Sequence, residues 1–232
     1  MDSEPARFYF SSTDSTNLRA ARFAAEHPGV PAVFVAERQT AGRGRLGHSF
    51  ASPPGGLYIS YLLYPDMPPA DAGELTIYTA AVLSDILEDM TGTPVGIKWV
   101  NDLYMNGKKI AGILAEGAIS GDGTLAHAVV GIGINLRHTD FPPDIAAVAS
   151  TVEDESGTAP ERPTLERRLT AAMTAFRPHL PGIIDAYRRR MFLTGMTVTV
   201  EKGCETFDAE VLGVTDDGAL LIKTRDGQTT PL

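Results

Sequence analysis

Residues 98–116, with the sequence KWVNDLYMNGKKIAGILAE, decide the fold. Asn106 and Gly107 both tolerate a positive φ, and such a pair between apolar segments is a strong signal for a tight β-hairpin turn. The two arms of this hairpin are expected to be Leu103–Met105 and Ile110–Ile119. The stretch therefore predicts a pair of antiparallel strands, around which the remaining elements can be arranged.

Apolar segments on both sides of the hairpin predict further strands and helices, by their alternating or helical spacing. The predicted strands cover residues 33–36, 57–64, 97–100 and 128–136, and the predicted helices cover 17–26, 71–90, 165–176 and 182–190. Asp14, Ser15 or Thr16 is expected to cap the first helix. Residues 138–162 are expected to form a long connection. The fold class is therefore α+β, a mixed, largely antiparallel sheet with helices packed against one face.

The chain changes in character near residue 190. From Met191 onward it consists of short β-type runs, separated by turn signals at Lys202-Gly203, Asp217-Gly218 and Asp226-Gly227. Short strands punctuated in this way are typical of a small all-β unit. We therefore expect two domains, residues 1–190 and residues 191–232.

The overall charge and cysteine content exclude several classes of protein. The chain has 232 residues and a formal net charge of -9, which opposes binding to nucleic acid or to an anionic membrane. A single cysteine, Cys204, excludes a disulfide within the chain. No apolar run approaches membrane-spanning length, and the N-terminus lacks a signal-peptide pattern. A cytoplasmic protein is expected, in which any anionic substrate must be held by a local basic cluster.

Residues 42–47, Gly-Arg-Gly-Arg-Leu-Gly, are a basic segment in this acidic chain. Glycines let backbone N–H groups approach a ligand closely, and arginines provide planar donors suited to phosphate or carboxylate oxygens. The spacing matches neither a Rossmann fingerprint nor a P-loop. From this segment alone, an anion-binding loop and a surface loop with solvated arginines are equally good interpretations.

The hairpin is expected to return Lys109 into the same cleft as Asn101 or Asp102. A lysine, an amide and a carboxylate suit nucleotide chemistry, because they offer charge to phosphate, hydrogen bonds and a place for Mg²⁺. The alternative is a hairpin that simply faces solvent. Residues 131–136, Gly-Ile-Gly-Ile-Asn-Leu, place glycines inside an apolar strand, which indicates either close approach of a ligand or tight strand packing.

Five segments occur together in order: residues 15–17 (Ser-Thr-Asn), 39–45, 98–104, 109–116 and 131–135. Each is modest alone, but their order and spacing closely resemble one family, the biotin–protein ligases, also called biotin–[biotin carboxyl carrier protein] ligases or holocarboxylase synthetases. Roughly residues 8–190 resemble the catalytic domain and 191–232 the small C-terminal domain. The resemblance implies a fold like that of class II aminoacyl-tRNA synthetases and biotin–lipoate ligases, with a small C-terminal SH3-like β-barrel.

The resemblance also implies roles for individual residues. Biotin is expected to contact Ser15, Thr16, Asn17, Gln39, Arg43, Gly44, Arg45, Lys109, Gly112 and Gly133. The nucleotide is expected to contact Arg43, Arg45, Asn101, Asp102, Lys109 and Asn135. Lys109, Arg45 and Asp102 are the expected catalytic residues, with Asp102 placing Mg²⁺.

The activity that the resemblance implies has two steps. Biotin and ATP form biotinyl-5'-AMP, and the biotinyl group then passes to a lysine of a biotin carboxyl carrier protein, in acetyl-CoA carboxylase or a related carboxylase. Such chemistry requires charge neutralisation and alignment but no covalent protein nucleophile, so Cys204 is not needed. The family match begins near residue 8, so neither an N-terminal DNA-binding domain nor a repressor role is expected.

The chain departs from the family pattern at three positions. The family commonly has proline where Val100 stands, arginine where His48 stands and tryptophan where Phe50 stands.

The oligomeric state is open, and an exposed sheet edge near Val129–Ile134 would support a homodimer.

Three other functions remain as alternatives. A lipoate–protein ligase shares the fold and the two-step chemistry, but usually has an Arg-Arg…Gly-Gly-Gly stretch that this sequence lacks. A non-catalytic biotin sensor would need the pocket without Lys109, Asp102 and Asn135 together. A generic nucleotide-binding protein is the third alternative.

Overall fold

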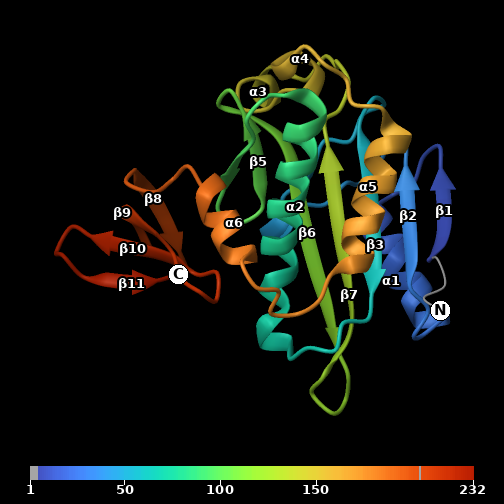
Figure 1. Cartoon of the computed structure of the whole chain (residues 1–232), viewed down its shortest axis with the longest axis horizontal. Helices are drawn as coiled ribbons and strands as arrows, with labels where there is room; N and C mark the ends of the chain where they lie inside the picture. Colours follow the sequence, from blue (N-terminus) through green and yellow to red (C-terminus); the bar gives the residue numbers. More distant parts are fainter. Residues whose placement is uncertain (1–4, 204) are drawn as a thin grey trace.

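The computed structural model describes residues 5–203 and 205–232. Within these residues a central sheet has the strand order β1-β2-β3-β7-β6-β5-β4 (Figure 1). Its strands are β1 (Ala6–Phe10), β2 (Ala32–Ala36), β3 (Leu57–Leu63), β4 (Gly96–Lys98), β5 (Asp102–Met105), β6 (Lys108–Ile119) and β7 (Leu125–Ile134). β1 and β2 are parallel, and the other neighbouring strands are antiparallel. The predicted mixed, largely antiparallel sheet is confirmed.

The hairpin formed by β5 and β6 has the predicted turn. Asn106 and Gly107 have φ values of 47° and 81°, the two positive values that a type I′ turn requires. Tyr104 pairs with Lys109, and a register shift lies beside this pair. The turn thus fixes a register in which Lys109, the second residue of β6, lies opposite Tyr104 of β5.

Strand β7 lies inside the sheet, with β3 on one side and β6 on the other. The expected exposed edge near Val129–Ile134 is therefore wrong, because the backbone of this segment is paired with both neighbours. A run of apolar residues indicates a strand but does not reveal its position in the strand order. β1, which the sequence did not predict, is an edge strand instead.

Helices cover both faces of the sheet, not one as predicted. They are α1 (Thr16–Glu26), α2 (Gly73–Thr91), α3 (Pro143–Ala146), α4 (Val152–Ser156), α5 (Arg162–Ala175) and α6 (Ile183–Arg190). Along β2, Val33 and Val35 belong to the core cluster that includes α2 and α5, whereas Ala32 and Phe34 pack with Ala20 of α1. Successive side chains of a strand point to opposite faces, so α1 covers the face opposite α2.

The connection of residues 138–162 is more ordered than predicted, since it contains α3 and α4. It also runs beside the hairpin: the backbone N–H of Lys109 donates to Val148 O at 3.0 Å, and the N–H of Ser150 donates to Lys109 O at 3.0 Å. The connection therefore supports the first residues of β6 from one side.

The predicted all-β unit is present at the C-terminal end as an antiparallel sheet in the order β11-β10-β9-β8 (Figure 1). Its strands are β8 (Thr197–Lys202), β9 (Glu205–Val214), β10 (Leu220–Thr224) and β11 (Thr229–Pro231). Val211 and Ile222 belong to the same apolar cluster as the core under α2. Cys204 lies outside the described residues. Among the residues that the structure describes, no helix has the length and apolarity to span a membrane.

Candidate active site

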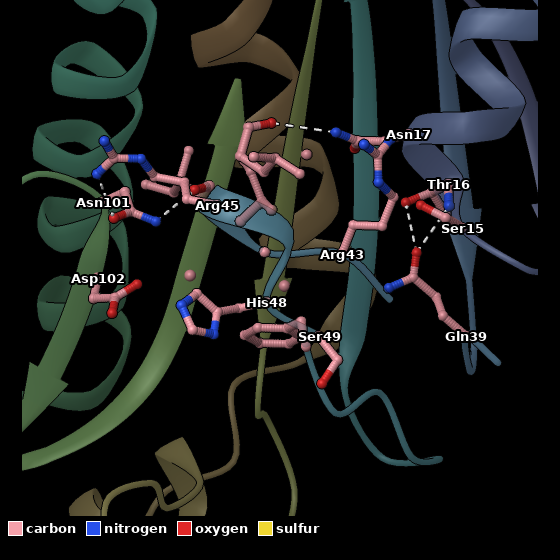
Figure 2. Close-up of a pocket in the computed structure, with 18 of the residues that line it drawn as sticks. Ser15, Thr16, Asn17, Gln39, Arg43, Arg45, His48, Ser49, Asn101 and Asp102 are labelled. Carbon is pink, nitrogen blue, oxygen red and sulfur yellow. Dashed lines mark hydrogen bonds between the residues drawn. The ribbon is translucent and has the colours of Figure 1, made fainter. Parts of the chain in front are cut away.

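A cavity of about 270 Å³ opens beside the start of α1 and the loop of residues 39–50 (Figure 2). It is lined by Ser15, Thr16, Asn17, Gln39, Arg43, Gly44, Arg45, Leu46, His48, Ser49, Phe50, Asn101, Asp102, Lys109, Gly112, Ile113, Leu114, Gly131, Ile132 and Gly133. All the site residues predicted from the sequence are in this lining except Asn135. Five segments far apart in the chain thus meet around one cavity.

The polar end of the cavity is built by the first turn of α1 and by Gln39 (Figure 2). Gln39 Oε1 accepts hydrogen bonds from the Thr16 backbone N–H at 2.8 Å and from its hydroxyl at 3.1 Å, and Gln39 Nε2 donates to Ser52 Oγ at 3.0 Å. Ser15 precedes the helix, as predicted, but its side chain makes no capping hydrogen bond. The Asp14 carboxylate instead accepts from the Ser15 N–H at 2.8 Å.

Asn17 is buried, and protein groups engage both ends of its amide. Its Nδ2 donates to Glu116 Oε2 at 2.8 Å and to Leu114 O at 3.3 Å. Its Oδ1 lies 2.6 Å from the Ser60 hydroxyl, which is also 2.7 Å from Thr16 Oγ1. The sequence predicted Asn17 at the site, but not Ser60 as the buried group that orients it.

Three glycines of β6 and β7, Gly112, Gly131 and Gly133, line the cavity, and the side chains of Asn17 and Phe50 pack closely on them. A Cβ on Gly131 would lie 2.0 Å from Asn17 Oδ1, and a Cβ on Gly133 would lie 2.5 Å from the Phe50 ring. Gly112 pairs with Gly133 across the strands, and its Cβ would lie 3.1 Å from the same ring. Side chains therefore pack closely on these glycines, and Gly112, Gly131 and Gly133 also line the cavity, so contact with a ligand stays a prediction.

The glycine-arginine segment is an ordered loop. The Gly44 N–H donates to His48 O at 2.7 Å, and the Phe50 N–H donates to Gly42 O at 2.9 Å. Leu46 has a φ of 53° and is exposed at the tip. The arginines on either side of Gly44 line the cavity. This geometry favours the anion-binding interpretation over a surface loop with solvated arginines.

The charged end of the cavity is formed by the hairpin and this loop. Lys109 Nζ lies 2.7 Å from Asp102 Oδ1, and Arg45 Nη1 donates to Asn101 Oδ1 at 3.4 Å. Figure 2 shows Arg45 beside Asn101, on the same side of the cavity as Asp102. The lining contains three cationic side chains, Arg43, Arg45 and Lys109, and one carboxylate. This is the local basic cluster that an anionic substrate needs in a chain with a net charge of -9.

The turn at residues 99–101, just before β5, is held by two hydrogen bonds to distant parts of the chain. The Tyr187 hydroxyl of α6 donates to Val100 O at 3.0 Å, and Trp99 Nε1 donates to Gly218 O at 3.0 Å. Burial raises the pKa of Tyr187, so its hydroxyl stays a neutral donor. The sequence did not identify Tyr187, because its role depends on α6 packing against a distant turn.

Asn135 does not line the cavity. Its side-chain Nδ2 donates to Ser150 O at 3.1 Å, and its backbone carbonyl accepts from the Val152 N–H at 2.8 Å. In this structure it fastens the connection of residues 138–162 to the end of β7. Its assignment to the nucleotide therefore stays a prediction.

Asp102 carries the carboxylate in the cavity lining that could help to hold a cation. Its Oδ1 is buried and, apart from the ion pair with Lys109, has no hydrogen-bond donor among the described residues. The described part of the chain has no cluster of three or more His, Cys, Asp or Glu side chains that could hold a metal by itself. Mg²⁺ is commonly bound by only one or two carboxylates together with substrate phosphates, so Asp102 fits one such position.

Comparison with known proteins agrees with this geometry. The model of the biotin/lipoate A/B protein ligase family matches residues 9–135. The biotin--[acetyl-CoA-carboxylase] ligase of Paracoccus denitrificans is 32% identical over 231 residues, which cover 93% of each chain. The bifunctional ligase/repressor BirA of Bacillus subtilis (strain 168) is 30% identical over 230 residues, covering 94% of this chain and 70% of the relative.

A solved structure shows the same fold. The biotin protein ligase from Aquifex aeolicus in complex with biotin and ATP superposes with a TM-score of 0.79 at 28% identity, covering 98% of this chain and 95% of that chain. The family model spans more than half of the present chain, and the two sequence relatives extend the match to nearly all of it. The chain therefore belongs to the biotin/lipoate A/B protein ligase family, among its biotin–protein ligases.

Proposed function

We propose that this protein forms biotinyl-5'-AMP from biotin and ATP, and then transfers the biotinyl group to a specific lysine of a biotin carboxyl carrier protein. The observation that carries the proposal is the polarity of one cavity. Thr16 and Gln39 offer neutral polar groups on one side of the cavity, whereas Arg45 and the Lys109–Asp102 pair lie on the other side (Figure 2). Biotin has the same polarity, with a neutral ureido ring at one end and a carboxylate at the other.

The relatives support this assignment. The Paracoccus denitrificans relative is named as a biotin--[acetyl-CoA-carboxylase] ligase, and the Aquifex aeolicus structure holds biotin and ATP. We infer that biotin contacts Ser15, Thr16, Gln39, Arg43, Gly44, Arg45, Lys109, Gly112 and Gly133. Asn17 positions the neighbouring polar groups through its contact with Ser60, which in turn contacts Thr16. We infer that the nucleotide contacts Arg43, Arg45, Asn101, Asp102 and Lys109. Residues 1–190 would form the catalytic domain and residues 191–232 a second domain.

The first step joins two anions that repel each other. A carboxylate oxygen of biotin attacks the α-phosphorus of ATP, a new P–O bond forms, and the bond to the β-phosphate breaks to release pyrophosphate. Lys109 and Arg45 offset the negative charge at the reacting oxygens, and the ordered loop of residues 39–50 aligns the two substrates. The step needs no proton transfer and no covalent bond to the protein.

We also propose that Asp102 helps to bind Mg²⁺. The ion would be held by this carboxylate together with oxygens of the ATP phosphates, and when bound it would reduce the negative charge of the phosphates. Asp102 also holds the Lys109 ammonium in place from the neighbouring strand.

In the second step the neutral amine of the acceptor lysine attacks the acyl carbon of the adenylate. A C–N bond forms, the C–O bond to the phosphate breaks, AMP leaves with the electron pair, and the amine loses a proton to solvent. We propose that the acceptor is a carrier domain of acetyl-CoA carboxylase or a related carboxylase. A role as a repressor is not proposed, because the net charge of -9 opposes binding to DNA.

The direct test is to incubate the purified protein with biotin, ATP, Mg²⁺ and a carrier domain, and to weigh the carrier by mass spectrometry. A mass increase of one biotinyl group that requires all three small molecules is expected. The same assay with lipoate in place of biotin separates the two branches of the family. Biotin binding without pyrophosphate release would indicate a sensor and overturn the proposal.

A further inference from the structure

Glu116 on β6 lies outside the cavity lining but contacts two residues that are in it. Its Oε2 accepts a hydrogen bond from Asn17 Nδ2 at 2.8 Å, and its Oε1 lies 3.1 Å from Arg43 Nη2. A second guanidinium nitrogen, Arg43 Nη1, is 3.5 Å from Oε2. One carboxylate thus links the first turn of α1 with the loop that carries the arginines.

On the α1 side, Glu116 completes the hydrogen bonding of a buried amide. Asn17 is 5% exposed, and its other Nδ2 partner is Leu114 O at the longer distance of 3.3 Å. A buried amide donor without a good partner is costly, so Glu116 fixes which way the amide points. The orientation also sets the contact of Asn17 Oδ1 with Ser60, which in turn lies against Thr16.

On the loop side, Glu116 attaches the loop to the sheet. The hydrogen bonds of Gly44 and Phe50 hold the loop to itself and not to β6. The ion pair of Arg43 with Glu116 joins it to the sheet at the polar end of the cavity. At the cationic end, the contact of Arg45 with Asn101 has the same function.

Building on the proposed function, we propose that Glu116 is a positioning residue of the biotin site. One carboxylate oxygen orients Asn17 and thereby the polar groups that meet the ureido ring. The other oxygen holds Arg43, so that the loop stays closed over biotinyl-5'-AMP until the acceptor arrives. Glu116 touches neither substrate, and its effect is on biotin binding and on retention of the intermediate.

Two substitutions separate these two contacts. Glu116→Gln keeps an oxygen that accepts from Asn17 but loses the ion pair with Arg43. Its KM for biotin should stay within about twofold of wild type, while biotinyl-5'-AMP should escape into solution about two- to fivefold faster, as expected for an exposed ion pair. This difference should shrink as ionic strength rises, because salt screens the pair in the wild type.

Glu116→Ala removes both contacts. Its KM for biotin should rise about tenfold, because a buried donor loses its partner. The kcat for biotin-dependent pyrophosphate release should fall by less than KM rises, since no group at the reacting atoms is lost. Glu26→Gln, an exposed position at the end of α1, removes the same charge elsewhere and serves as the control. Circular dichroism and thermal unfolding establish that each variant is folded.

The outcomes distinguish this inference from the proposed function. If the wild type releases no pyrophosphate with biotin and ATP, the proposed function fails. If the wild type is active but both Glu116 variants match Glu26→Gln in KM and in escape of the intermediate, only the role of Glu116 is refuted. A fall in kcat at unchanged KM would also refute it, because it would indicate an effect on the chemical step.

Discussion

Lys109 Nζ lies 2.7 Å from Asp102 Oδ1, and the two side chains are only 26% and 23% exposed. They stand on the two arms of one hairpin, whose type I′ turn fixes their register. A flexible lysine is therefore held at a defined place before any substrate arrives. Such preorganisation means that little rearrangement is needed when a phosphate takes the place of the carboxylate as the partner of the ammonium.

Lys109→Ala should slow adenylate formation severely without unfolding the protein. The substitution removes a positive charge from the reacting oxygens, and the loss of one preorganised donor typically lowers kcat about 10²- to 10³-fold. Biotin-dependent pyrophosphate release measures this directly. Lys108→Ala is the matched control, because Lys108 is half-buried like Lys109 but lies outside the cavity lining and donates to the backbone carbonyls of Ala146 and Ala147. Pyrophosphate release at the wild-type rate would show that Lys109 is not catalytic.

Arg45→Gly should loosen retention of the adenylate more than it slows its formation. Arg45 Nη1 donates to Asn101 Oδ1 at 3.4 Å, and without this side chain the loop loses a contact with the segment before β5 and a donor to phosphate. Hydrogen bonds to charged groups are worth about 1.5–3 kcal/mol, so the intermediate should dissociate at least tenfold faster. Rapid filtration after mixing with biotin and ATP measures the dissociation rate. Arg45→Lys keeps the charge and should lie between wild type and glycine. Equal retention in all three proteins would contradict the role of Arg45.

The residues that line the cavity could be predicted because their types and their order along the chain are visible in the sequence itself. Glycines, arginines and lysine in recurring segments indicate a ligand site, and the resemblance to a family located twelve of them correctly in the lining. Ser60 and Glu116 could not be assigned roles in this way. Their function depends on which strands are neighbours, and strand order is a property of the whole sheet.

The same reasoning explains the errors in the fold. The turn at Asn106 and Gly107 was predictable because it depends on the conformational preferences of two adjacent residues. The interior position of Val129–Ile134 and the edge strand Ala6–Phe10 depend on pairing between segments far apart in the chain. Helix α1 shows an apolar stripe, but the stripe does not reveal which face of the sheet it will cover.

Gly131→Ala should weaken biotin binding. The new Cβ would lie 2.0 Å from Asn17 Oδ1, so the amide must move and lose its contact with Ser60. Overpacking of this kind typically costs about 1–3 kcal/mol, which should appear as a lower Tm and a higher KM for biotin. Gly121→Ala, in the turn between β6 and β7, is the control because nothing lies within 4 Å of the added methyl group. If both variants bind biotin equally well, the close packing of Asn17 on Gly131 is not required for the site.

Glu88→Gln should make stability less dependent on acid pH. The Arg190 guanidinium, which hydrogen-bonds the Glu88 carboxylate, holds the pKa of Glu88 below its ordinary value of 4.5. A carboxyl group with a lowered folded-state pKa stabilises the protein above its unfolded-state pKa, and this contribution is lost as pH falls through the folded-state value. Because Glu88 is 39% exposed, the effect should be small, about 0.5–1 kcal/mol at pH 7.

Calorimetric unfolding of both proteins at pH 7 and near pH 3 tests this prediction. The variant should have the lower Tm at pH 7, since glutamine cannot form the charged contact between α2 and α6. The difference should shrink near pH 3, where the wild-type carboxylate becomes protonated and loses the same contact. Glu26→Gln should show no such pH-dependent difference, because the described structure gives Glu26 no charged partner. A constant difference at both pH values would mean that packing, and not the charge of Glu88, joins the two helices.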